Sequence, residues 1–184
     1  MKSYIVGIVF VALSIFVITN ADTEKTKENP LSRGWGDEIE WVPWDDAVEI
    51  ALEQNKPIFL LIHKEWCQAC QNLKKIFKQK NAQKVFTTLS KFFVMTNTQD
   101  EEEPHEEEYK PDGNYSPRVL FLDKRGDVLE DFVNEKAEYK NYKYYYSNPS
   151  HIFNTMKKVI KHYGKEVPQL RSTKKLVPKN KKEL

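Results

Sequence analysis

The two cysteines of this chain lie close together, in the segment Cys67-Gln68-Ala69-Cys70. They follow an apolar run at 58–62 that is typical of a buried strand, and they precede apolar residues at helical spacing. A cysteine at a helix N-terminus is favoured as thiolate, because free N–H groups and the helix dipole stabilise negative charge there. A second cysteine about one turn along can attack a mixed disulfide and release the bound thiol. The spacing therefore predicts a redox-active pair.

Two other uses of the cysteine pair compete with a redox role. A structural zinc site needs four ligands, and beside the pair the chain offers only four scattered histidines, with no second CxxC and no HxxxH. A closed structural disulfide of this short span would constrain almost no loop entropy. We therefore favour redox chemistry over both alternatives.

A second candidate element is the dipeptide Ser116-Pro117, directly before the apolar segment 118–123. A proline that opens a strand is often only an edge residue. Downstream of a redox cysteine pair, we expect it instead to belong to the site.

The elements that must position these residues alternate between strands and helices. In chain order we expect a short strand around Ile39 and Trp41, a helix from Asp45-Asp46 to 54, a central strand at 58–62, a helix after Cys70, a helix at 81–89, strands at 92–96 and 118–123, a turn at 124–127 leading to 128–129, and a helix around 152–160. Crossover helices enforce parallel pairing, and the short turn enforces an antiparallel edge. The order therefore predicts an α/β fold with a central mixed β-sheet flanked by helices.

Composition narrows the functional class. The chain has 184 residues, 40% of them hydrophobic and 30% charged, with a formal net charge of +2. These values fit one globular domain with appendages and argue against a disordered chain, a polytopic membrane protein or a nucleic-acid-binding surface.

Both ends of the chain look like targeting signals. Residues 1–21 combine an early lysine, an apolar run and an acceptable cleavage site after Ala21, which predicts a secretory signal peptide; an uncleaved anchor or a buried element are the alternatives. The chain ends in KKEL, which is close to KDEL-type retention signals. We expect a signal peptide at 1–21, a flexible leader at 22–32, a domain at 33–165 and a basic tail at 166–184. The expected location is the lumen of the endoplasmic reticulum, with secretion as the alternative.

The motifs carry a family resemblance. The segments concerned are Gly34-Trp35-Gly36-Asp37, Ile62-His63-Lys64-Glu65-Trp66-Cys67, Cys67-Gln68-Ala69-Cys70, the acidic stretch from Asp100, Pro111-Asp112-Gly113, Ser116-Pro117 with the strand after it, and Tyr142-Lys143-Tyr144-Tyr145-Tyr146. Together they resemble the thioredoxin superfamily, and within it the small thioredoxin-domain proteins of the endoplasmic reticulum that are related to the anterior gradient proteins.

The resemblance implies a thioredoxin fold and a thiol–disulfide oxidoreductase acting on protein disulfides. Cys67 takes the role of nucleophile, Cys70 that of resolving thiol, and the two form a Cys67–Cys70 disulfide. Pro117 takes the role of cis-proline, Ser116 would offer backbone groups to a substrate strand, and Trp66 forms an aromatic lip. No metal and no bound cofactor is implied.

The resemblance also implies partners. Glutathione is the expected redox partner and secretory-pathway proteins are the expected clients. We expect a monomer with no nucleic-acid partner and no membrane attachment after signal cleavage. A non-catalytic chaperone or adaptor that binds secretory clients is the alternative function.

Several positions depart from the superfamily pattern. Gln68-Ala69 stands between the cysteines where relatives usually have glycine first, and Leu61 stands where thioredoxins keep a buried aspartate. Proton transfer to Cys70 would then need water or another group, such as Glu65 or Lys64. The anterior gradient proteins carry one cysteine of the pair, whereas both are present here, which favours catalysis.

Three further features have two interpretations each. We interpret the acidic block 100–108 as a solvated, mobile insertion rather than a weak Ca²⁺ site, because no EF-hand spacing is present. The tyrosines at 139–146 are expected to pack over the sheet edge rather than to bind clients. The sequon Asn114-Tyr115-Ser116 is followed by proline, so we expect no glycan there.

Overall fold

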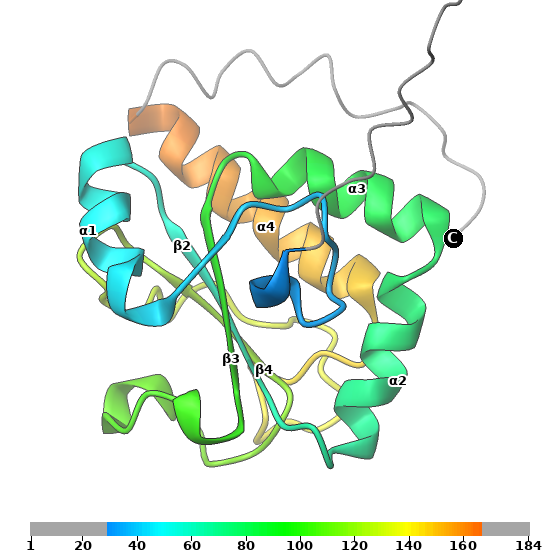
Figure 1. Ribbon diagram of the computed structural model, residues 1–184. Coiled ribbons are helices and arrows are strands. Elements are labelled where there is room, and N and C mark those ends of the chain that lie inside the picture. The colour runs from blue at the N-terminus through cyan, green and yellow to red at the C-terminus, as the bar shows by residue number, and fades with distance from the viewer. Residues whose placement is uncertain (1–28, 167–184) are drawn as a thin grey trace, which may run out of the picture.

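A four-stranded sheet with helices on both faces forms the centre of the protein (Figure 1). The computed structural model describes residues 29–166. Its elements are the 3-10 turn η1 (Pro30–Ser32), β1 (Trp41–Val42), α1 (Trp44–Gln54), β2 (Ile58–His63), α2 (Gln68–Phe77), α3 (Lys80–Ser90), β3 (Val94–Gln99), η2 (Asp100–Glu102), η3 (Glu107–Tyr109), β4 (Arg118–Leu122) and α4 (Pro149–Glu166). The expected signal peptide, most of the leader and the KKEL tail lie outside the described residues.

The strands are arranged in the order β1-β3-β2-β4. β3 runs parallel to both β1 and β2, whereas β4 pairs antiparallel with β2. Every residue of β2 is buried, as expected of a central strand whose two faces are both covered. The predicted α/β class with a mixed sheet is confirmed.

Alternate side chains of β2 enter two separate cores. Phe59 and Leu61 pack with residues of α2, α3 and α4, while Ile58, Leu60 and Ile62 pack with α1. The larger core is rich in aromatic rings. Phe86, for example, is fully buried and contacts Phe59, Phe77, Trp41 and Phe153 at ring-centroid distances of 4.7–6.0 Å. This packing holds α2 against the sheet and so fixes the position of the helix whose N-terminus carries the cysteines.

Two expected strands differ from the prediction. The strand expected at 92–96 begins later, because the Phe92 and Phe93 N–H groups close the end of α3 on the carbonyls of Leu89 and Ser90. It also continues through the buried polar residues at 96–98, which carry no apolar signal. The antiparallel strand expected after the turn at 124–127 is reduced to a single bridge between Leu122 and Val128, since the chain turns again at 129–132.

No helix within residues 29–166 is both long enough and apolar enough to cross a bilayer.

Candidate active site

The cysteine pair lies where the central strand passes into α2. After β2 ends, a turn in which the Cys67 N–H donates to the Lys64 carbonyl (3.3 Å) leads into the helix. Cys67 is the N-cap of α2, and the Cys70 N–H donates to its Sγ at 3.1 Å. The two cysteines are joined as a disulfide, with their Cα atoms 5.2 Å apart. Cys67 keeps 7% of its surface exposed and Cys70 only 1%, so Cys67 is the more accessible member of the pair.

The Ser116-Pro117 loop faces this pair from the start of β4. The Ser116-Pro117 peptide bond is cis, and the Ser116 carbonyl oxygen lies 3.5 Å from the Cys67 Sγ. Trp66 is 79% exposed directly before Cys67. Segments almost fifty residues apart therefore meet here, and they include every residue that the sequence analysis assigned to the site.

Glu65 and Lys64, the residues considered for proton transfer to Cys70, hydrogen-bond to the acidic block. Leu61, which stands where thioredoxins keep a buried aspartate, is buried in the larger core. The Lys64 ammonium donates to the Asp100 carbonyl and pairs with Glu103 at 2.8 Å. Glu65 is exposed, and its N–H donates to the Asp100 carboxylate at 3.0 Å. Lys64 is thus already engaged by a backbone carbonyl and a carboxylate.

The acidic block is not simply a solvated insertion. Most of its glutamates are exposed, as expected, but the Glu103 side chain is only 11% exposed and pairs with both Lys64 and Arg118. Its two cationic partners come from segments distant in sequence, so the sequence pattern could not reveal the anchoring. Burial alone would raise the pKa of Glu103, but the hydrogen bonds from Lys64 and Arg118 hold it below its ordinary value. Among residues 29–166 no group of three or more His, Cys, Asp or Glu side chains could hold a metal ion.

A buried histidine near the pair was missed by sequence reasoning. His63, the last residue of β2, is 1% exposed and its Nε2 lies 3.1 Å from the Asn97 Oδ1. The Arg33 guanidinium donates to the same Asn97 oxygen at 3.1 Å, and the Trp35 ring packs edge-on against the imidazole. Burial lowers the pKa of His63 to about 4, with help from the Lys74 and Arg33 cations and against the hydrogen bond to Asn97. The sequence feature that could have revealed His63 is a histidine at the end of an apolar strand, just before the CxxC.

The tyrosines are divided between core and surface. Tyr144 and Tyr146 are buried, as the packing interpretation predicts. Tyr139 and Tyr142 are 55% and 42% exposed. Together with Tyr115 and Tyr145, these two form a four-ring tyrosine cluster with ring centroids 4.5–6.5 Å apart. Tyr115 directly precedes Ser116, so the tyrosine cluster is joined to the Ser116-Pro117 loop through the backbone.

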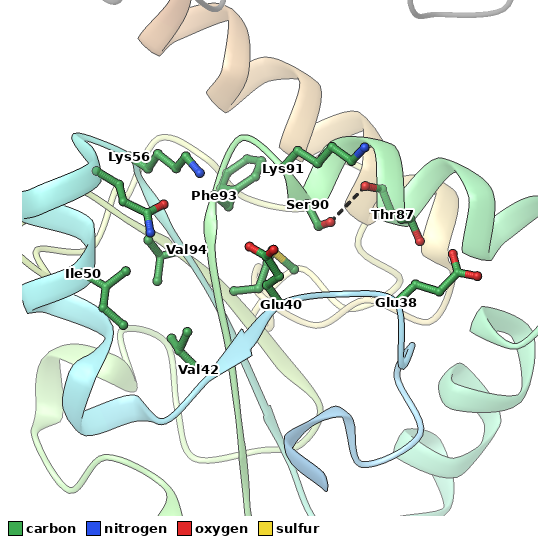
Figure 2. A pocket seen from close by; sticks show the side chains of 12 residues that line it. Glu38, Glu40, Val42, Ile50, Lys56, Thr87, Ser90, Lys91, Phe93 and Val94 are labelled. Carbon is green, nitrogen blue, oxygen red and sulfur yellow. Dashed lines mark hydrogen bonds between the residues drawn. The ribbon is translucent and has the colours of Figure 1, made fainter. Parts of the chain in front are cut away.

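A separate cavity of about 260 Å³ lies beside β1 (Figure 2). Its walls come from α1, α3, β1 and the start of β3, with Glu40 and Lys91 among its charged residues. None of the residues assigned to the site lines it.

Comparison with known proteins gives one consistent picture. A family model described as thioredoxin-like matches residues 40–124, a range that includes both cysteines and Pro117. Anterior gradient protein 2-B of Xenopus laevis is 31% identical over 156 residues, which cover 83% of this chain and 90% of that protein. Anterior gradient protein 3 of Xenopus tropicalis is 37% identical over 115 residues, covering 60% and 68%. The human anterior gradient protein 2 homolog is 32% identical over 141 residues, covering 76% and 77%.

Proposed function

This chain belongs to the thioredoxin superfamily of disulfide oxidoreductases, as a relative of the anterior gradient proteins, and we propose that it exchanges thiols and disulfides with client proteins in the lumen of the endoplasmic reticulum. The observation that carries the proposal is the placement of Cys67. It begins α2, is bonded to Cys70, and faces the Ser116 carbonyl at 3.5 Å.

In the proposed reduction, the Cys67 thiolate attacks one sulfur of a client disulfide. A bond forms between Cys67 Sγ and that sulfur, the client S–S bond breaks, and the other client sulfur leaves as a thiolate that takes up a proton. Cys70, after losing its proton, attacks Cys67 Sγ, which forms the Cys67–Cys70 disulfide and releases the second client thiol. Two electrons have then passed to the client. The reverse sequence oxidises a client dithiol.

The local geometry supports this assignment of roles. A thiolate at position 67 would accept the Cys70 N–H that now donates to the sulfur at 3.1 Å, at the positive end of the α2 dipole. The Ser116 backbone lies beside the nucleophile, where it could pair with the extended chain that flanks a client cysteine. Trp66, which is 79% exposed directly before Cys67, would offer an aromatic surface to the client.

Glutathione is the redox partner that we propose for the pair. Two glutathione thiols would reduce the Cys67–Cys70 disulfide and leave as glutathione disulfide, so the electrons balance. The signal-like residues 1–21 and the KKEL ending support the proposed lumenal location. The equilibrium potential against a glutathione buffer tests the direction: a value of about −180 to −210 mV supports oxidation or isomerisation, and about −270 mV supports reduction.

The proposal is tested by trapping clients. Cys70→Ser removes the resolving thiol, so mixed disulfides between Cys67 and clients should accumulate in oxidising cells and disappear on treatment with reductant. Cys67→Ser is the matched control and should form none. A correctly folded Cys70→Ser protein that collects no adducts would refute catalysis through this pair.

A non-catalytic chaperone or adaptor is the second candidate, and the exposed rings of the tyrosine cluster favour it. It requires that client binding survives replacement of both cysteines and is lost on Tyr139→Ser with Tyr142→Ser. The opposite pattern, with binding lost when the cysteines are replaced, supports the oxidoreductase.

A further inference from the structure

A buried arginine holds the Ser116-Pro117 loop from behind. Arg118 begins β4 and is fully buried, so its charge needs partners inside the protein. One branch of its guanidinium donates to the Tyr115 carbonyl and, at 3.3 Å, to the Asn114 side chain. The other branch pairs with Glu103. Arg118 thus fixes the backbone immediately before Ser116.

Glu103 connects that loop to the turn that leads into α2. Its second oxygen lies 2.8 Å from the Lys64 ammonium, and the Lys64 carbonyl accepts the Cys67 N–H at 3.3 Å. Asp100 adds a second attachment, because its carboxylate accepts the Glu65 N–H at 3.0 Å. The segment that follows β3 is therefore tied to both sides of the site, at the end of the sheet where α2 begins (Figure 1).

We propose that Lys64, Glu103 and Arg118 form a positioning bridge that holds the Ser116 carbonyl against Cys67 and thereby shapes the groove for a client backbone. The inference rests on the proposed function and adds to it a set of residues that never touch the reacting sulfurs. The contact that the bridge maintains is the 3.5 Å approach between the Ser116 carbonyl oxygen and the Cys67 Sγ.

The charged groups of the bridge are suited to fixing the position of the Ser116-Pro117 loop relative to the turn before Cys67. Charged hydrogen bonds are short and directional, and the arginine fork fixes two directions at once. A buried ion pair adds little net stability compared with well-packed apolar residues, so its main effect here is on the relative position of the two loops. The neighbouring pair between Glu102 and Arg33 lies at the surface, with the Glu102 side chain 54% exposed, and reaches neither loop.

The test compares a substrate whose backbone binds in the client groove with one that only has to reach the Cys67 sulfur. Lys64→Gln should raise the KM for a disulfide-bonded peptide about tenfold, equivalent to the loss of one charged hydrogen bond. Its rate with a small aromatic disulfide, which has no backbone to bind, should stay within about twofold of wild type. Lys64→Arg should restore the peptide KM. Lys110→Gln is the matched control, since Lys110 pairs with Glu107 in the same connection, 3.5 Å apart and away from the site.

Three results would overturn the bridge. An unchanged peptide KM in Lys64→Gln would do so, and so would equal slowing with both substrates, because the bridge would then act on the cysteines themselves. If Lys64→Gln does not fold, Arg118→Lys provides the test from the other end: it keeps the charge beside Glu103 but gives up the fork to Tyr115. An unchanged peptide KM in that variant would also overturn the bridge.

Failure of the proposed function gives a different result. A wild-type protein that turns over neither disulfide refutes the oxidoreductase. The bridge is then tested by amide hydrogen exchange in residues 115–119, which should be faster in Lys64→Gln than in Lys110→Gln; equal exchange in the two variants would refute it.

Discussion

Mild acidification should weaken the fold through the buried His63. In the folded protein its pKa is lowered from 6.5 to about 4. Between these two values the unfolded chain binds a proton that the folded chain does not, so stability falls as the pH decreases through this range and is fully present above it. The full difference in stability is about 3 kcal/mol, since each tenfold change in the proton-binding constant is worth about 1.36 kcal/mol.

The loss can be measured before the carboxylates interfere. At pH 5 the linkage relation gives about 2 kcal/mol of lost stability relative to pH 7.5. Ordinary Asp and Glu side chains remain mostly ionised at pH 5, so carboxylates contribute little to the change between these two pH values, and a variant of His63 identifies its own share. Urea unfolding at both pH values gives the free energy of unfolding directly. The wild-type curve should move to lower urea at pH 5 with an unchanged slope.

The matched variant is His63→Gln, which keeps a neutral donor toward Asn97 but has no proton to gain. It will be less stable at both pH values, yet it should lose almost nothing between them. His105→Asn replaces an exposed histidine and should keep the full wild-type loss. Equal losses of stability in wild type and His63→Gln on going from pH 7.5 to 5 would show that His63 is not the group responsible.

Two further predictions follow from the burial of Phe86 and the exposure of Trp66. Phe86→Ala removes a fully buried ring from the centre of the larger core and should lower the free energy of unfolding by about 3–5 kcal/mol, measured by urea denaturation; a loss below about 1 kcal/mol would contradict the packing described. Trp66→Ala removes a side chain that is 79% exposed, so the same measurement should change by less than about 0.5 kcal/mol while kcat/KM for a disulfide-bonded peptide falls several-fold. An unchanged kcat/KM would remove Trp66 from the client-binding surface.

Much of the fold could be predicted because its signals are local. The apolar run of β2 and the helical spacing of Leu73 and Phe77 depend on neighbours in sequence, and the structure has a strand and a helix there. The start of β3 could not be placed, because Phe92 and Phe93 look like strand residues but close a helix instead. Which apolar residues cap a helix depends on tertiary packing.

The candidate site shows the same division. The cysteine pair and Pro117 could be proposed from sequence because their spacing is itself the signal. The Glu103 anchor and the buried His63 could not, since their roles depend on Arg118, Lys64 and Asn97, which come from other strands and turns. The role of a charged residue or a histidine cannot be predicted from sequence until its interaction partner is known.

The connection between β3 and β4 has a consequence for how this protein can change over evolutionary time. Residues 100–117 supply both Glu103 and Ser116, whereas the cysteines belong to the junction of β2 and α2. Under the proposed function, substitutions in this one connection would therefore alter which clients fit beside Cys67, without disturbing the strand and helix that carry the cysteines. Glu103 and Ser116 could then change in evolution and alter part of the client groove while the two cysteines stay constant.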